Sequence, residues 1–413
     1  MSCGPWKPIR IETFQARIEE IDIPYTISED LSTATLNYTI TVTSPPPNTT
    51  LELELHEPSP NNTTSNNPIY TETISATSTK ITGTIDIGDP QLWYPHTHGK
   101  QPHYTLRLIL ASPSGPFDQL THRLPLRRAQ LIQRPLPNLK GTTFYFEINN
   151  IPIFAGGSNW IPPDTLLTRP SPETYESLLS LVEQGNQNML RVWGGGVYER
   201  DEFYEICDDL GILVWQDFCF ACGQYPGHPA FLDSVRREAE FQVKRLRKFA
   251  CVVLWCGNNE DYQVAEAAKL DWNPDDREEE RWLKGTFPGR YIYERILPEV
   301  VESLARGTEY HPGSPWGGKG TRDPTVGDIH QWNGTLNQLS IVNLQISSAF
   351  FLDLDVNGSM AWNSRTISSL PLPLRPICLR IRNAISPPPP QYLAIHHPFS
   401  LPSSSISRAR PPQ

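Results

Sequence analysis

The sequence predicts a multidomain β plus α/β fold, in which an immunoglobulin-like β-sandwich precedes an incomplete (β/α)8 TIM barrel and a disordered C-terminal tail. Residues 15–135 alternate apolar and polar side chains with a period of two between polar turns, which is typical of antiparallel strands. Residues 136–333 alternate short apolar runs with helical patterns, which indicates successive βα units. Residues 334–413 are rich in Pro and Ser and keep neither period, as is typical of disordered segments.

The composition excludes several classes of protein. The chain has 413 residues, a net charge of −10 and no basic stripe, so we expect no nucleic-acid partner. No apolar run approaches the ~20 residues of a membrane span, and the first residues lack the apolar core of a signal peptide, so we expect a cytoplasmic protein without a membrane partner. Seven cysteines without a regular framework fit reduced thiols. No pattern indicates the oligomeric state.

The sandwich is predicted from five alternating runs. Residues 1–14 precede it and contain a single strand pattern, which we interpret as the last strand of a truncated jelly-roll domain, because a lone strand cannot bury its apolar face. The alternating runs that follow are at residues 18–23, 36–42, 51–55, 81–87 and 104–110.

The insert before the last of these strands is rich in aromatic and histidine residues. It contains Trp93, Tyr94, His96 and His98. One interpretation is a cluster of metal ligands, but no Cys or acidic partner lies nearby. We therefore favour an aromatic plug between the sandwich and the next domain.

The α/β part begins with a hairpin. Residues 128–143 read as a linker, and a hairpin with its turn at Asn149-Asn150 follows, leading to a strand that ends near Trp160.

Helices are expected between the later strands. A first helix is capped by Ser171 and closed by Gly185, and a second one stops at Gly211. A third helix carries a run of basic residues that we interpret as a solvated face. A fourth is expected over residues 291–304.

Polar groups follow the apolar runs at residues 189–193, 212–215 and 251–256. In a (β/α)8 barrel the C-terminal ends of the strands meet at one mouth, where the chemistry takes place. This predicts an active site centred on Glu260.

Glu260 is a candidate general acid for cleaving a glycosidic bond. Such cleavage needs a carboxylic acid that protonates the leaving oxygen, and retaining enzymes place a second carboxylate ~5–5.5 Å away as the nucleophile. A pocket of aromatic rings would raise the pKa of Glu260. The alternative is a structural ion pair between Glu260 and an arginine. The candidates for the aromatic wall are Trp160, Trp193, Trp215, Trp255 and Trp332, of which Trp215 and Trp255 are more typical of core residues.

The spacing of the other reactive residues does not indicate a cofactor site. Cys219 and Cys222 have the spacing of a redox pair, but they follow a predicted barrel strand rather than open a helix, so we favour packing. His228, His311 and His330 have no metal-ligand spacing. We expect neither a metal nor any other cofactor.

Several motifs in this region are specific in combination. They are RVWGGGVYE, LVWQDFCFACG, WCGNNEDYQVAE, YHPGSPWGG and DPTVGDIHQWN. The chain resembles the β-mannosidases of glycoside hydrolase family 2, in their fungal intracellular form, over residues 2–333. This resemblance implies a retaining hydrolase that removes terminal β-D-mannose from the non-reducing ends of β-mannoside oligosaccharides.

The resemblance also implies roles for individual residues. Glu260 would be the acid/base, Asn259 would contact the sugar 2-hydroxyl, and Trp193 and Asp217 would line the mannose subsite. The family's nucleophile motif does not occur here, since no Glu follows Glu309. We interpret the unrelated sequence after residue 333 as the product of a frame or splice error.

Three functions therefore stay open. The first is a β-mannosidase that is impaired because it lacks the nucleophile. The second is a non-catalytic remnant or a sugar-binding pseudoenzyme. The third is another exo-glycosidase of the same family.

Overall fold

The computed structural model describes residues 6–59, 67–305, 307–317 and 319–331, and the backbone of residues 349–352. The expected site residue Trp332 lies outside the described residues. Residues 334–348 and 353–413 of the expected disordered tail also lie outside the described residues.

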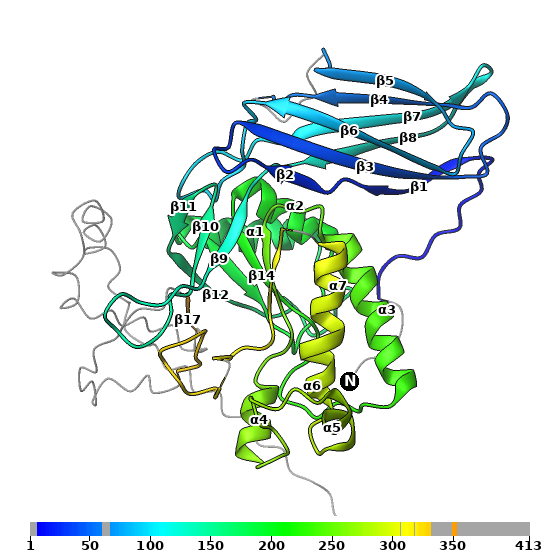
Figure 1. Ribbon diagram of the computed structural model, residues 1–413. Coiled ribbons are helices and arrows are strands. Elements are labelled where there is room, and N and C mark those ends of the chain that lie inside the picture. Colours follow the sequence, from blue (N-terminus) through cyan, green and yellow to red (C-terminus); the bar gives the residue numbers. More distant parts are fainter. Residues whose placement is uncertain (1–5, 60–66, 306, 318, 332–348, 353–413) are drawn as a thin grey trace, which may run out of the picture. The chain divides into compact units, whose positions relative to one another are not determined.

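Two antiparallel sheets form the first part of the chain (Figure 1). Strand β3 alternates buried and solvent-facing residues along its whole length, which confirms the period-two pattern read from the sequence. Buried residues of both sheets belong to one apolar cluster. In one sheet β3 pairs with the other three strands, and the order in the second is β5-β4-β7-β8. The strands are β1 (Arg17–Asp22), β2 (Tyr25–Ile27), β3 (Thr33–Thr43), β4 (Thr50–His56), β5 (Tyr70–Ser75), β6 (Lys80–Gly88), β7 (Tyr104–Ser112) and β8 (Gly115–Leu124).

The insert between β6 and β7 contacts the α/β part. Trp93 is fully buried, and its Nε1 donates a hydrogen bond to the carbonyl oxygen of Asp208 (2.8 Å). The N–H of His96 donates to the carbonyl oxygen of Gly211 (2.9 Å). The expected plug between the sandwich and the next domain is confirmed for these two residues.

A small antiparallel sheet of order β11-β10-β9 follows. Its hairpin turn at Asn149 and Asn150 is as expected, and both residues have positive φ (49° and 65°), as a type I′ turn requires. The expectation of a linker over residues 128–143 is wrong at its start, because residues there form a strand that pairs with β10. The strands are β9 (Ala129–Ile132), β10 (Tyr145–Ile148) and β11 (Ile151–Ile153).

A parallel sheet of order β16-β15-β14-β13-β12-β17 carries the second half of the chain. Its strands are β12 (Ala155–Trp160), β13 (Met189–Val192), β14 (Leu213–Asp217), β15 (Val252–Cys256), β16 (Glu309–His311) and β17 (Ala349–Leu352). Strand β17 lies in the expected disordered tail, so that expectation is wrong for these residues. Strand β12 pairs in parallel with β13 on one side and with β17 on the other.

The helices between these strands follow the expected caps. Helix α1 has Ser171 as its N-cap and Gly185 as its C-cap, and Gly211 ends α2 in the left-handed conformation. The helix expected over residues 291–304 is interrupted by a π-helical turn. The acidic residues 271–285, for which we predicted no element, contain a short helix at Glu279–Lys284, and another short helix, Asp261–Ala267, directly follows Glu260. The elements are α1 (Pro172–Gln184), α2 (Asp201–Leu210), α3 (Pro229–Leu246), α4 (Asp261–Ala267), α5 (Glu279–Lys284), α6 (Gly289–Tyr291), the π turn η1 (Ile292–Ile296) and α7 (Leu297–Leu304).

The two faces of the parallel sheet have different partners. Leu190, Val192 and Val214 pack with the residues of α1, α2, α3 and α7 in one apolar cluster. Met189 and Trp215, which alternate with them, belong to a second cluster that also contains residues of β9 and β10. Because side chains alternate along a strand, β12, β13, β14 and β15 each contribute to both clusters.

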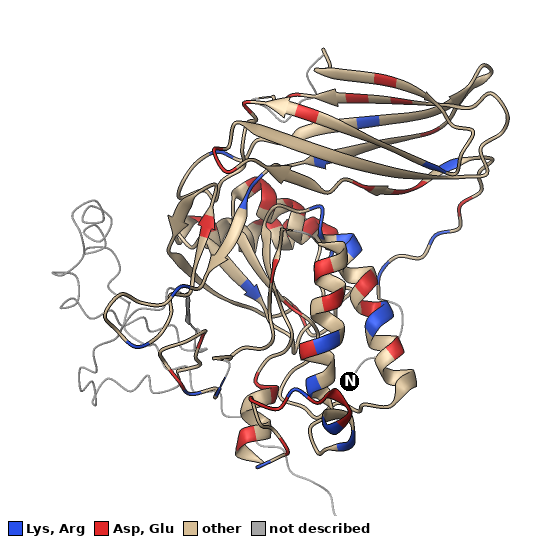
Figure 2. Cartoon of the chain, in the orientation of Figure 1, with Lys and Arg blue, Asp and Glu red and all other residues tan. Residues whose placement is uncertain are grey.

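The basic residues of α3 form ion pairs, and α3 carries both signs of charge, whereas the charged residues of α7 are acidic (Figure 2). Arg236 binds Glu299 on α7 (2.8 Å), and Arg237 binds Asp233 on α3 itself (3.1 Å). This agrees with a solvated face rather than a nucleic-acid surface. Among the described residues, no helix combines the length and apolar character that crossing a bilayer requires.

Candidate functional site

Glu260 follows strand β15 and is held between two loops. Isolated parallel bridges join Asn259 to Ala221 on one side and to Ser314 on the other. The N–H of Asn259 donates to the carbonyl oxygen of Phe220 (2.9 Å), and the N–H of Glu260 donates to that of Ser314 (2.8 Å). The hydrogen bonding of the sheet therefore continues past the end of β15, between the loops that follow β14 and β16.

The backbone of Glu260 is left-handed, with φ 66° and ψ 4°. A residue with a Cβ pays roughly 1–2 kcal/mol for this conformation, and such strain often occurs at functional sites. Asn258 stabilises the corner with its side chain. Its Oδ1 accepts from the N–H of Asp261 (3.0 Å), and its Nδ2 donates to the carbonyl oxygen of Pro312 (3.0 Å).

The carboxylate of Glu260 binds a histidine. Its Oε1 lies 2.7 Å from Nδ1 of His330, and the two side chains are only 18% and 15% exposed. Its Oε2 accepts from Sγ of Cys222 (3.5 Å). The hydrogen bond from His330 lowers the pKa of Glu260, although partial burial acts in the opposite direction. The expectation of a raised pKa is therefore wrong, because a donor that contacts a carboxylate stabilises its ionised form.

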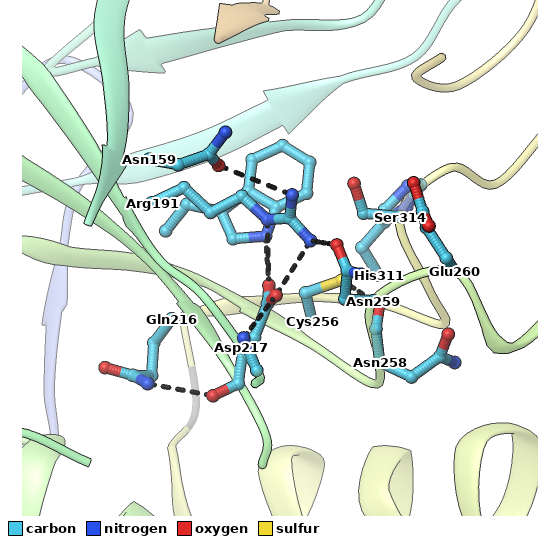
Figure 3. Close-up of polar contacts among 12 residues, drawn as sticks. Asn159, Arg191, Gln216, Asp217, Cys256, Asn258, Asn259, Glu260, His311 and Ser314 are labelled. Atoms are coloured by element: carbon cyan, nitrogen blue, oxygen red, sulfur yellow. Dashed lines mark hydrogen bonds and ion pairs between the residues drawn. The ribbon is translucent and has the colours of Figure 1, made fainter. Parts of the chain in front are cut away.

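The buried arginine beside Glu260 is Arg191 of β13, which we did not predict as a site residue. Its Nη2 donates to Oδ2 of Asp217 (2.8 Å) and to Oδ1 of Asn259 (2.9 Å). Its Nη1 donates to Oδ1 of Asn159 (3.4 Å). Figure 3 shows the guanidinium between these three side chains. The alternative in which Glu260 forms a structural pair with an arginine therefore finds no support, since Arg191 pairs with Asp217.

Asp217 differs from its expected position in the mannose subsite. It is fully buried, and each carboxylate oxygen already accepts two hydrogen bonds. The donors to Oδ1 are Nε of Arg191 (3.3 Å) and Nε1 of Trp215 (2.9 Å). The donors to Oδ2 are Nη2 of Arg191 (2.8 Å) and the N–H of Gly194 (3.0 Å). Asp217 therefore acts on the site through Arg191 rather than by facing a ligand.

Asn259 keeps its expected place next to Glu260. Its Oδ1 accepts from Arg191, and its Nδ2 donates to Sγ of Cys222 (3.3 Å). Sulfur is a weak acceptor, so the Nδ2 group retains hydrogen-bonding capacity for a stronger one.

Trp193 lies at the end of β13 and is half-buried. A Cβ at Gly195 would overlap the Trp193 ring, so the ring lies directly against the glycine backbone. A substrate contact of Trp193 stays a prediction.

Trp160 belongs to the core rather than to a pocket wall. It is 8% exposed, and its ring contacts Tyr175 and Phe203. Its Nε1 donates to Oε1 of the buried Glu199 (2.9 Å). The expectation that Trp160 lines the site is therefore not supported. Trp215 and Trp255 are fully buried, in agreement with a core role.

The two cysteines of the CxxC sequence have different environments. Cys219 is half-buried and packs, as expected, against the apolar cluster that contains the residues of α1, α2, α3 and α7. Cys222 is exposed and contacts Glu260 and Asn259, which the packing interpretation did not predict.

The loops after β16 bring further polar residues to Glu260. Ser314, Asp328 and His330 are joined by hydrogen bonds, and His311 contacts Asp328. Sequence reasoning treated the two histidines as unrelated, because nothing in the sequence indicates that these loops meet. Among the described residues, no group of three or more His, Cys, Asp or Glu side chains could hold a metal ion.

Comparison with known proteins identifies the family. Residues 16–127 match the family model "Glycosyl hydrolases family 2". The chain is 46% identical over 336 residues to Beta-mannosidase B of Thermothelomyces thermophilus, a match that covers 81% of this chain and 38% of the relative. It is 42% identical over 338 residues to Beta-mannosidase B of Aspergillus fumigatus, with 81% and 39% covered. This chain thus spans about two fifths of the length of these relatives.

Solved structures give the same result. The crystal structure of a Beta-D-Mannosidase from Dictyoglomus thermophilum is similar with a TM-score of 0.65 and 36% identity, over 77% of this chain and 37% of that one. A Beta-Glucuronidase from Parabacteroides merdae is similar in fold alone, with a TM-score of 0.56, 15% identity and 72% and 33% covered. This protein belongs to glycosyl hydrolase family 2.

Proposed function

We propose that this chain carries the acid/base part of a retaining β-mannosidase site, with Glu260 as the acid/base. The proposal includes the finer architecture, with an immunoglobulin-like sandwich over residues 15–135 and a partial (β/α)8 barrel over residues 136–333. The substrates would be β-mannoside oligosaccharides with a terminal non-reducing mannose, as the names of the relatives suggest.

The observation that carries this proposal is the placement of Glu260. It lies at the C-terminal end of β15, its backbone is fixed by Ser314, and its carboxylate is only partly exposed. Active sites of barrel enzymes are built from residues in this position. A carboxyl group whose ionisation is set by its neighbours is what general acid–base catalysis requires.

The residues around Glu260 support a polar sugar subsite. Within the part of the chain that the structure describes, Nδ2 of Asn259 donates to a thiol alone, so it would donate to a sugar 2-hydroxyl. Arg191 fixes the other end of that amide. The half-buried ring of Trp193 would pack against the face of the sugar.

Two features support an impaired activity. A retaining mechanism needs a second carboxylate as the nucleophile, and the sequence contains no Glu after Glu309. In addition, the pKa of Glu260 is lowered by His330, whereas a nearby second carboxylate would raise it. With a lowered pKa, Glu260 is ionised at neutral pH and suited to act as a base rather than as an acid.

A panel of nitrophenyl glycosides tests the proposal. We expect weak hydrolysis of the β-mannoside in preference to the β-galactoside and the β-glucuronide. The Glu260→Gln variant should lower any kcat/KM for the mannoside by ~10²–10⁴-fold. Glu302→Gln, on an exposed position of α7, is the matched control and should leave it unchanged. Preference for another glycoside would contradict the choice of mannose, and turnover that survives in Glu260→Gln would contradict the role of Glu260.

The lack of a nucleophile favours a second candidate, a sugar-binding protein without turnover. Titration calorimetry with mannose separates the two. Binding without hydrolysis of any glycoside in the panel would support the second candidate, and hydrolysis that requires Glu260 would exclude it.

A further inference from the structure

A chain of hydrogen bonds leads from Glu260 into the protein. Nδ1 of His330 lies 2.7 Å from Oε1 of Glu260, and Nε2 of the same ring lies 2.9 Å from Oγ of Ser314. Oγ of Ser314 in turn donates to Oδ2 of Asp328 (2.6 Å). Oδ1 of Asp328 lies 2.7 Å from Nε2 of His311.

The protons along this chain can be counted. Burial acts to raise the pKa of Asp328, but the hydrogen bonds from His311 and Ser314 and the electrostatic effect of His311 and His330 together outweigh it, and the pKa is lowered. Asp328 is therefore an ionised acceptor. Because Ser314 gives its single hydroxyl proton to Asp328, its Oγ accepts from Nε2–H of His330. When Glu260 is ionised, Nδ1 of His330 also carries a proton and donates to Oε1.

This arrangement makes the two carboxylate oxygens of Glu260 unequal. Oε1 accepts a hydrogen bond from Nδ1–H of His330, and Ser314 fixes the orientation of that ring through its hydrogen bond with Nε2. Among the described residues, the donor to Oε2 is the weak thiol of Cys222, at 3.5 Å. A proton that binds Glu260 while Nδ1 keeps its own therefore meets less competition at Oε2 than at Oε1, which already accepts the ring N–H.

We propose that His330 is a positioning residue for Glu260, whose hydrogen bond to Oε1 leaves Oε2 as the oxygen that takes up and releases the proton. This inference rests on the proposed acid/base role of Glu260. On release, the Oε2–H bond breaks, its electron pair stays on the carboxylate, and the proton passes to an acceptor oxygen that faces Oε2. That acceptor is water in the free protein, and the leaving-group oxygen in the proposed reaction.

Other charged and titratable groups also face the pair. Arg191 acts on Glu260 from β13, and the Cys222 thiol acts on it from the loop after β14. Asp261 follows Glu260 at the start of α4, and each carboxylate opposes ionisation of the other. On the far side of His330, Asp328 interacts electrostatically with the imidazole.

NMR of the full chain tests the proposal without a substrate. Glutamate labelled with ¹³C at the side-chain carboxyl reports the ionisation of Glu260, assigned by its loss in Glu260→Gln. Histidine labelled with ¹⁵N reports Nδ1 of His330, assigned by its loss in His330→Asn. In the wild type we expect Nδ1 to stay protonated while Glu260 takes up its proton. Loss of the Nδ1 proton during that step would place the new proton at Oε1 and overturn the proposal.

Substitutions of His330 give a second measurement. His330→Ala removes the donor, so the titration of Glu260 should shift to higher pH. In His330→Asn the amide Nδ2 takes the place of Nδ1 as an uncharged donor, so the titration should lie between those of the wild type and His330→Ala. An unchanged titration in a folded His330→Ala would overturn the proposal. Should that variant fail to fold, an unchanged titration in His330→Asn would do the same.

The control is His228→Asn. His228 is exposed and caps α3 by accepting from the N–H of Phe231 (3.2 Å), and Asn is also a good N-cap residue. The His228→Asn variant should leave the titration of Glu260 unchanged. A shift equal to that of His330→Asn would overturn the proposal. Because these measurements need no sugar, absence of glycoside hydrolysis would count against the proposed function alone.

Discussion

The ion pair between Arg191 and Asp217 fixes the residues on which the site depends. The two side chains are 3% and 0% exposed, and the carboxylate also holds the N–H of Gly194. Breaking a buried pair by removing one partner costs about 3–5 kcal/mol, because it leaves the other charge uncompensated. We therefore expect Asp217→Asn to lower the free energy of unfolding by about this amount, measured as a shift of the urea midpoint.

The chain offers a matched control for this substitution. Asp233 forms an ion pair with Arg237 on α3, but both side chains are largely exposed, at 67% and 70%. Exposed pairs of this kind contribute ~0–1 kcal/mol, so Asp233→Asn should hardly move the midpoint. Equal effects of the two substitutions would mean that burial does not set the strength of the Arg191–Asp217 pair.

Single residues of the site were predictable to the extent that they follow a strand end. Glu260 and Asn259 come directly after an apolar run, so their position could be inferred from the sequence. His330 and Cys222 contact Glu260 from loops that lie 70 and 38 residues away in sequence. No local pattern encodes such a contact, which is why the imidazole donor was missed and the pKa of Glu260 was predicted in the wrong direction.

At the scale of elements, the left-handed end of α2 is coupled to the insert before β7. Gly211 has φ 68°, and a Cβ there would meet the backbone nitrogen of His96 at 2.5 Å and Nε2 of Gln101 at 2.6 Å. Gly211→Ala should therefore lower the free energy of unfolding by about 1–2 kcal/mol from the left-handed backbone alone, plus the cost of displacing the insert. Thermal unfolding measures the sum.

Gly88→Ala is the corresponding control. Gly88 ends β6, and a Cβ there would have nothing within 4 Å. The same change in side chain should then leave the melting temperature nearly unchanged. A loss at Gly88 as large as that at Gly211 would show that neither the positive φ nor the contact with the insert matters.

A strand could be predicted from the sequence when one of its faces is buried in the core. Central strands such as β4 and β7 alternate clearly, and their inner residues are fully buried. Strands β5 and β8 lie at the edges of the same sheet and carry few buried residues. An edge strand is recruited by backbone hydrogen bonds to its neighbour rather than by an apolar face, so its hydrophobic pattern is too weak to be read.

For the whole molecule, two buried aspartates make stability depend on pH. Burial raises the pKa of Asp208 to about 7, and it does the same for Asp261. An unfolded aspartate has a pKa of about 3.9. Between these values the folded state holds protons that the unfolded state has released, so the free energy of unfolding decreases as the pH rises. This contribution is complete below pH ~4 and is lost as the pH rises through about 7.

The Asp208→Asn variant isolates one of these contributions. The amide oxygen can still accept from the N–H of Cys251, as the carboxylate does at 2.7 Å, but the side chain no longer titrates. The variant should match the wild type near pH ~4 and become more stable than it toward pH ~7, by about 3 kcal/mol. Urea midpoints measured across this range give the difference directly. Asp275→Asn, at an exposed position, should give a difference that does not change with pH. If the difference for Asp208→Asn is equally flat, burial does not keep that carboxyl protonated in the folded protein.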